Sequence, residues 1–104
     1  MTTDPTYDVV WPRSPVGVQS RTPAPRLHSL AGRRIAFVWD YLFRGEEIFP
    51  IVERELRRAF PDVEFVGYDA VGNIHGSDEK SRVAQLPHVL ANHRVDAVIC
   101  GNGC

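Results

Sequence analysis

Two cysteines stand close together in the segment VDAVICGNGC of residues 95–104. Cys100 and Cys104 have the spacing C-x3-C. A thiolate is both a nucleophile and a metal ligand, and two neighbouring thiols can exchange with a disulfide. The spacing therefore permits several chemistries and selects none of them. The residues between the two cysteines are Gly101, Asn102 and Gly103.

The two cysteines have different expected environments. Cys100 ends an apolar run, and packing in the core is the expected role of such a cysteine. Cys104 follows a glycine-rich stretch, where backbone amides would favour the thiolate and make it a nucleophile. An inert, exposed cysteine is an equally weighted interpretation of Cys104. We take Cys104 as the first catalytic candidate and Cys100 as the second.

A metal centre is not expected. A structural zinc site has four ligands, and the two cysteines leave it two ligands short. His75, His88 and His93 have no recognisable ligand spacing relative to them. The Gly-Asn-Gly stretch also lacks the third glycine and following helix of a dinucleotide fingerprint. We predict neither metal nor cofactor, and keep residues 101–103 as ligand-binding candidates because glycine lets a ligand approach the backbone.

Three further polar residues are candidates for ligand binding. Asp40 and Tyr41 directly follow the apolar run IAFVW, and His75 lies in the glycine-flanked loop GNIHG. A carboxylate and an imidazole can also act as general acid or base. Aspartates that follow a strand commonly cap a loop instead, so Asp40 and Asp69 keep that second interpretation.

The pattern of apolar residues predicts the elements that position these groups. The continuous run of residues 35–39 is typical of a strand that is buried on both faces. Pro50 is tolerated only in a first helical turn, so we expect the first helix to start near Phe49. Strands are predicted at 35–39, 63–68 and 95–100, with helices at 49–59 and 78–90.

Strands that alternate with helices predict a parallel sheet. Right-handed crossovers place the first strand in the middle, which gives the order 2-1-3. The carboxyl ends of strands one and three are then neighbours, and open α/β sheets bind their ligands at such a point. We predict an incomplete Rossmann-like or flavodoxin-like α/β domain over residues 32–104, with its site at this tip.

Residues 1–31 are predicted to form an extended arm. Prolines lack an amide donor and push the preceding residue toward extended geometry, so no regular helix fits here. The apolar part of the arm, residues 7–11, either lies on the domain or belongs to a free tail. The five prolines of the arm are Pro5, Pro12, Pro15, Pro23 and Pro25.

Charge and hydropathy exclude several classes of protein. A formal net charge of -1 leaves no basic excess for a phosphate backbone, so we expect no nucleic-acid partner. No apolar stretch approaches the roughly 20 residues of a membrane span, and the first residues do not resemble a secretory signal. We expect a cytoplasmic protein that acts on a small-molecule or thiol substrate. A homo-oligomer and a complementing second chain both remain open.

Three segments resemble the UGSC-type (seleno)protein family: LAGRRIAFVWDYLFRGEEIF, FVGYDAVGNIHG and VDAVICGNGC. They extend over residues 30–104. The resemblance implies a Rossmann-like domain and a redox or thiol-dependent activity. In that family a Sec/Cys-Gly-Ser-Cys motif follows the strand that AVICGNGC occupies here. The motif is absent from this sequence, so only the loop before it, residues 101–104, is carried over.

Two other functions stay open beside a thiol or selenol oxidoreductase. Strand-tip cysteines of proteins similar to Asp/Glu racemases act as proton-transfer bases, and Cys104 would take that role here. The chain could also be a non-catalytic subunit or fragment completed by a second polypeptide. We expect the first function for the family, in a chain that continues beyond Cys104 through selenocysteine.

This expectation predicts the codon after that of Cys104. Selenocysteine is encoded by UGA, which is ordinarily translated as a stop. Sequencing the gene beyond the codon for Cys104 should therefore show UGA, followed by codons for Gly, Ser and Cys. A UAA or UAG codon at that place would contradict the expectation.

Overall fold

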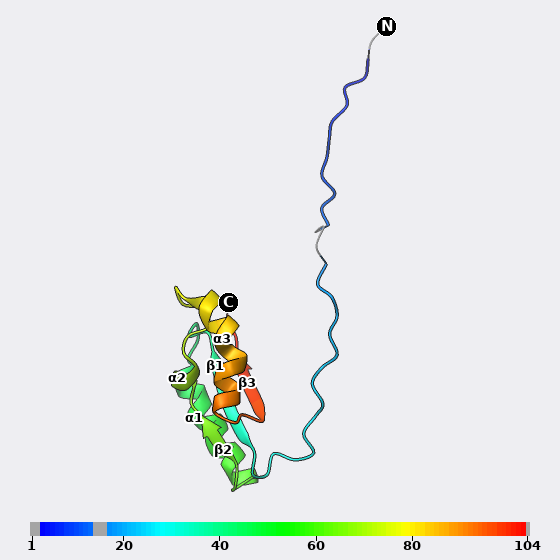
Figure 1. The fold of residues 1–104 in the computed structure, drawn as a ribbon. Helices are drawn as coiled ribbons and strands as arrows, with labels where there is room; N and C mark the ends of the chain where they lie inside the picture. The colour runs from blue at the N-terminus through cyan, green and yellow to red at the C-terminus, as the bar shows by residue number, and fades with distance from the viewer. Residues whose placement is uncertain (1–2, 14–16, 104) are drawn as a thin grey trace.

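The structure, a computed structural model, describes residues 3–13 and 17–103. Its strands form one parallel sheet in the order β2-β1-β3 (Figure 1). The predicted α/β class and the predicted strand order are thereby confirmed. Along the chain the elements are β1 (Arg34–Trp39), α1 (Gly45–Ala59), β2 (Glu64–Val66), α2 (Tyr68–Val71), α3 (Glu79–Asn92) and β3 (Ala97–Gly101).

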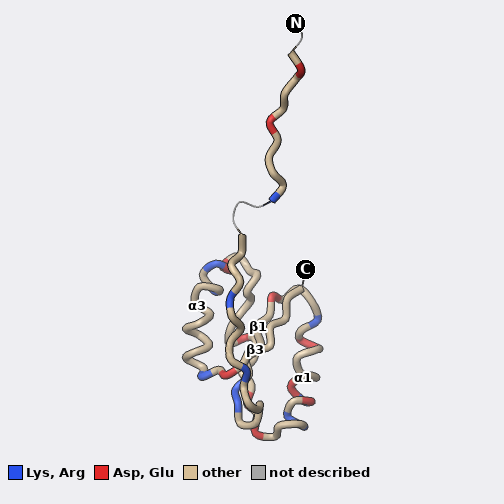
Figure 2. The backbone as a smooth tube through the Cα atoms, turned by 90° about the vertical axis from the view of Figure 1, so that its right-hand side faces the viewer, with Lys and Arg blue, Asp and Glu red and all other residues tan. Residues whose placement is uncertain are grey.

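The sheet lies between two helices. Figure 2 shows α1 and α3 on opposite sides of β1 and β3. This arrangement is expected of right-handed crossovers, because the connection from β1 to β2 and the connection from β2 to β3 run in opposite directions across the sheet. The short helix α2 packs near β1 and α3, at the end of the sheet where the strands finish.

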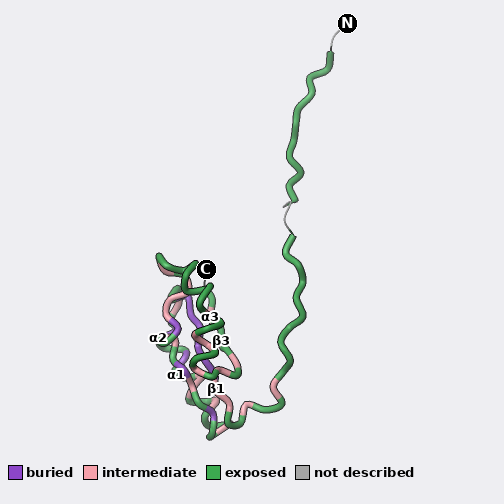
Figure 3. The backbone as a smooth tube through the Cα atoms, viewed as in Figure 1, coloured by how far each residue is buried: buried purple, intermediate pink, exposed green. Residues whose placement is uncertain are grey.

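The central strand β1 forms the core. Residues 35–40 are all buried, because β1 has a strand on each side and a helix over each face (Figure 3). Phe37 is 1% exposed and packs against Phe49 of α1, with ring centroids 4.9 Å apart. Phe65 of β2 pairs with Ile35, so it lies on the same face as Phe37 and stacks on it at 5.7 Å. The aromatic residues thus join α1 and β2 to the central strand.

The opposite face of the sheet is covered only in part. All residues of α3 are at least partly exposed, and Val83 is half exposed. In β3, Val98 and Cys100 pair with Ala36 and Val38 and therefore lie on the same face as those residues. Ala36 and Val38 are buried, whereas Val98 is 42% exposed and Cys100 is exposed.

The prediction that Cys100 is a buried packing cysteine is therefore wrong. β3 is an edge strand of the sheet. On the face that carries Cys100, the coverage of the sheet does not extend to this strand, so the thiol is exposed. The apolar run of residues 97–100 identifies the strand correctly. This run does not reveal which helices or strands cover each face of β3.

Other element boundaries also differ from the prediction. Helix α1 begins at Gly45, so Pro50 lies in its second turn and cannot donate to the carbonyl of Glu46. β2 covers only three residues, and Tyr68 belongs to α2 instead of the predicted strand. Helix α3 follows Asp78 as predicted and continues through Pro87 to Asn92.

The arm projects away from the sheet. Residues 3–13 and 17–26 are exposed, and the longest axis of the molecule measures 83 Å against 30 and 25 Å for the others (Figures 1 and 3). Tyr7 and Trp11 are 81% and 73% exposed, so the apolar part of the arm does not lie on the domain. The boundary between the arm and the domain at residue 31 stays a prediction. Among the described residues, no helix has the length and apolar character that a membrane crossing needs.

Candidate functional site

A buried carboxylate joins the tips of β1 and β3. Asp40 is 6% exposed, and its Oδ2 accepts a hydrogen bond of 2.6 Å from the amide of Gly103. Its Oδ1 accepts a second hydrogen bond, of 3.2 Å, from the amide of Leu42. The backbone amide of Asp40 donates to the carbonyl of Gly101 at 3.3 Å. Asp40 thus caps two loops at once, as the loop-capping interpretation of this aspartate predicts.

These contacts make Asp40 a positioning residue. Hydrogen bonds to an ionised acceptor are roughly twice as strong as neutral ones, and contribute about 1.5–3 kcal/mol each. The bond to Gly103 connects residues that are 63 positions apart in the sequence. Asp40 therefore fixes the loop after β3 against the loop after β1.

Aromatic side chains fill the space beside the loop after β3. A Cβ atom built on Gly101 would lie 2.6 Å from Cζ of Phe43 and 2.9 Å from Cζ of Phe49. The glycine is thus required for the close approach of these two rings. These rings occupy the side of Gly101 on which a Cβ would lie, and its role in ligand binding stays a prediction.

The thiol of Cys100 is accessible on the uncovered face of β3. Its Sγ lies 3.7 Å from Oδ1 of Asn102, which is a weak S–H···O contact across the start of the loop. Both side chains are exposed. The structure thus places two predicted site residues side by side, next to the loop that Asp40 fixes. Cys104 lies outside the described residues.

Tyr41 has an unusual backbone conformation at the tip of β1. Its φ of 64° lies in the left-handed region, which costs about 1–2 kcal/mol for a residue with a Cβ. Its ring stacks on Trp39 at 4.3 Å and meets Tyr68 edge-on at 5.6 Å. These contacts with Trp39 and Tyr68 hold the strained residue in place. Bulky residues with such strain are concentrated at functional sites.

The surroundings of Tyr41 raise the pKa of its phenol above the ordinary 10.0. Partial burial is the largest cause, followed by the charges of Tyr68 and Asp69, while Arg82 acts in the opposite direction. Nε1 of Trp39 is buried in the same cluster without a hydrogen-bond partner among the described residues. The tip therefore combines a neutral phenol with an unused indole donor.

Tyr68 and Arg82 are the neighbours that sequence analysis missed. Arg82 donates to Asp78 at 2.9 Å and to the carbonyl of Val71 at 3.2 Å, so it ties α3 to α2. Gly72, with a φ of 87°, makes room for the guanidinium. The i,i+4 spacing of Asp78 and Arg82 is a sequence signal for their ion pair, whereas nothing in the sequence predicts the proximity of Tyr68 to Tyr41.

His75 lies in the loop that follows α2. Its Nδ1 is 3.3 Å from a carboxylate oxygen of Glu79, and its amide donates to Asn73 at 2.8 Å. The same loop reaches β1, because the amide of Ile74 donates to the carbonyl of Trp39 at 3.3 Å. The loop is thus attached to the tip, while the imidazole itself pairs with α3.

Two surface hollows lie away from this tip. One, of about 340 Å³, is lined by Pro50, Glu53, Arg54 and Arg57 of α1. The other, of about 330 Å³, lies where the arm meets the start of β3. Within residues 3–13 and 17–103, no three His, Cys, Asp or Glu side chains are grouped to hold a metal ion.

The fold and the tip define a small parallel α/β domain with a carboxylate-anchored loop beside an exposed thiol. Comparison with models of protein families, with curated proteins and with solved structures gives no match to this chain. The resemblance to the UGSC-type family therefore stays a prediction.

The raised pKa of Tyr41 predicts a component of the alkaline stability profile. Because the phenol ionises at higher pH in the folded chain, its contribution is complete below about pH 10 and is lost as pH rises through the folded pKa. Tyr41→Phe should therefore reduce the decline in the free energy of unfolding between about pH 9 and pH 12. Urea unfolding measures the decline, and tyrosinate absorbance measures the ionisation.

Tyr7→Phe is the matched control, because Tyr7 is 81% exposed on the arm. It should leave the alkaline decline as it is in the wild-type chain. Equal pH profiles for the Tyr41→Phe and Tyr7→Phe variants would show that the cluster does not perturb Tyr41.

Proposed function

We propose that the tip of β1 and β3 is the site of a thiol-dependent redox protein that acts on a small-molecule or thiol substrate. One observation carries the proposal: the buried carboxylate of Asp40 holds the amide of Gly103 at 2.6 Å. The residue that precedes Cys104 is therefore fixed at the tip, where the thiol of Cys100 is exposed. Because Cys100 and Cys104 belong to the same chain and are four positions apart, the second step of disulfide exchange is intramolecular.

The proposed reaction is thiol–disulfide exchange. The thiolate of Cys104 attacks one sulfur of a substrate disulfide, and the S–S bond breaks to release the first substrate thiolate. Cys100 then attacks the sulfur of Cys104 in the mixed disulfide and displaces the second substrate thiolate. Two electrons pass to the substrate, the protons of the two cysteines go to the released thiols, and a low-molecular-weight thiol reduces the protein again.

Other tip residues have supporting roles in this proposal. Asn102 orients the Cys100 thiol, and Asp40 positions the loop. Tyr41, stacked on Trp39, provides an aromatic surface with a phenol for substrate contact. His75 is a more distant ligand candidate, because its imidazole pairs with Glu79.

The proposed architecture is the first part of a Rossmann-like or flavodoxin-like fold. A parallel sheet in the order β2-β1-β3, with α1 and α3 on opposite sides, supports it. In such folds, ligands bind where the strand order reverses, which is the tip of β1 and β3 here. A reducing compartment such as the cytoplasm fits this chemistry, since thiols stay reduced there.

The cysteine-based racemase alternative has less support. A racemase site would use the loop amides to hold a substrate carboxylate. The amide of Gly103 already donates to Asp40, and the buried carboxylate would repel a second one. Thiol exchange does not require the loop to bind a substrate carboxylate.

Reaction with an aromatic disulfide reagent, 5,5′-dithiobis(2-nitrobenzoate), tests the proposal. The wild-type chain should consume one reagent molecule, release two thionitrobenzoate ions and end with a Cys100–Cys104 disulfide, which mass spectrometry identifies. Cys100→Ser and Cys104→Ser should each release one ion and keep one as a mixed disulfide. Asp40→Asn should slow the intramolecular step several-fold, because the amide of Gly103 loses its charged acceptor.

Asp62→Asn is the matched control for Asp40→Asn, since Asp62 is exposed and precedes β2 at the far end of the sheet. It should leave both steps unchanged. A wild-type chain that ends with two mixed disulfides, one on each cysteine, would contradict the proposal.

A further inference from the structure

The outer edge of β3 is open. β3 pairs with β1 on one side, and within the part of the chain that the structure describes no strand lies on its other side. An unpaired edge presents a row of backbone donors and acceptors to which another strand can add. Folded proteins usually block such an edge with charges, prolines, bulges or a covering segment.

The two edges of this sheet differ in that protection. β2 has only three residues, and its Glu64 forms an ion pair of 3.2 Å with Arg34. The guanidinium of Arg57 covers the ring of Phe65 at 5.2 Å. The five described residues of β3, AVICG, carry neither a charge nor a proline, and Val98 is 42% exposed. The edge of β3 is therefore the one suited to strand addition.

The arm contains a segment with the properties of the missing strand. Residues 6–11, TYDVVW, lie between Pro5 and Pro12 and have a complete set of backbone donors. Valine and aromatic residues favour strands. Its four large apolar side chains are all largely exposed on the projecting arm: Tyr7, Val9, Val10 and Trp11. The segment is about as long as β3, which has five residues.

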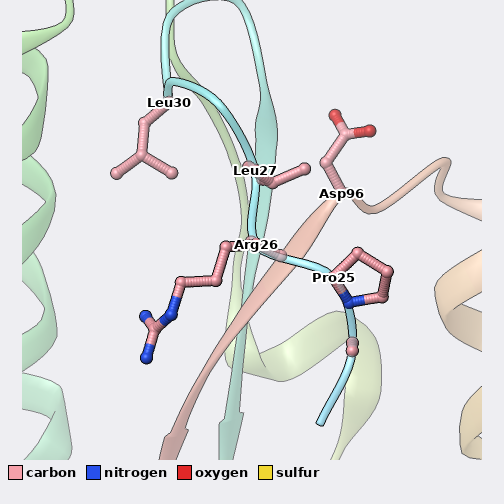
Figure 4. A pocket seen from close by; sticks show the side chains of 7 residues that line it. Pro25, Arg26, Leu27, Leu30 and Asp96 are labelled. Carbon is pink, nitrogen blue, oxygen red and sulfur yellow. The ribbon is translucent and has the colours of Figure 1, made fainter.

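The position and length of the arm favour an edge on another molecule. Figure 4 shows the base of the arm beside the start of β3, where residues 24–27 and Leu30 line a hollow with Asp96 and Ala97. Trp11 and Leu27 are 16 positions apart, and the chain between them reaches about 50 Å when extended. The five residues of β3 span only about 17 Å. Residues 6–11 therefore extend far beyond the domain's own sheet.

Folding the segment back onto its own β3 would require a reversal of the chain between residues 12 and 26. Pro12, Pro23 and Pro25 fall within this part of the arm. Proline-rich segments favour extended conformations and act as semi-rigid spacers. Addition to a second molecule avoids the reversal, and twofold symmetry lets each arm reach the other molecule in the same way.

We propose that residues 6–11 form a strand that adds to the open edge of β3 in a second copy of this chain. The resulting dimer has two identical contacts, in which each copy gives its arm and receives the arm of the other. Side chains of the added strand also cover the uncovered face beside Val98. The proposal concerns the 104-residue chain, in whose described part no strand occupies the outer edge of β3. It stands independently of the thiol chemistry, because it rests on this edge and on the arm.

Sedimentation velocity of the full chain over about a hundredfold range of concentration tests the proposal. The wild-type chain should dimerise. In Val9→Pro/Val10→Pro, one of the two adjacent prolines removes a donor that faces the partner, whichever way the strand is turned. The dissociation constant of the dimer should rise more than tenfold. Val18→Pro/Gln19→Pro makes the same change in an exposed part of the arm outside the segment and should have no effect.

The edge of β3 is tested by Val98→Lys, which places a charge at a partly exposed position and should also weaken the dimer more than tenfold. Circular dichroism confirms that this variant is folded. A mixture of the Val98→Lys and Val9→Pro/Val10→Pro chains should form a dimer with one intact contact, although neither variant does so alone.

Hydrogen exchange should show protection of residues 6–11 that increases with dimer formation. A wild-type chain that stays monomeric throughout would overturn the proposal. Protection of residues 6–11 in a monomer would also overturn it, because the segment would then bind its own sheet. A dimer that the prolines at positions 9 and 10 do not weaken would exclude the arm as the contact.

Discussion

The hydrogen bond between the buried carboxylate of Asp40 and the amide of Gly103 organises the tip of β1 and β3. A buried carboxylate is costly unless its oxygens are paired, and both oxygens of Asp40 have a backbone donor. The loops after β1 and β3 supply these donors. Both loops must therefore keep their conformation for the carboxylate of Asp40 to keep its two hydrogen bonds.

The parallel sheet makes this link possible. Two strands separated by more than 50 residues end side by side, because Trp39 of β1 pairs with Gly101 of β3. The aromatic cluster on one face then supports the tip. Trp39 contacts Phe49 of α1 and Tyr68 of α2. Residues that position the site and residues that form the core therefore belong to one continuous packing arrangement.

The sequence predicts those features that depend on local pattern. The apolar run of β1, the alternation of strands and helices, and the chirality of crossovers are sufficient for the strand order. They also predict that Asp40 lies near residues 101–103, and the hydrogen bond to Gly103 agrees.

Features that depend on tertiary contacts were not predictable. Helix α1 starts a turn early because Gly45 fits against Trp39, where a Cβ would lie 2.6 Å from the indole ring. Cys100 is exposed because β3 is an edge strand, and coverage of a strand face is not encoded in its own residues. The left-handed conformation of Tyr41 also depends on its contacts with Trp39 and Tyr68.

Amide hydrogen exchange at Gly103, followed by NMR in the wild-type chain and in Asp40→Asn, tests the central claim most directly. A hydrogen bond to a buried carboxylate predicts exchange at least about tenfold slower than in an unstructured peptide. The Asp40→Asn variant should lose that protection at Gly103 while the amides of β1 keep theirs. Exchange at Gly103 in the wild-type chain as fast as in an unstructured peptide would contradict the account.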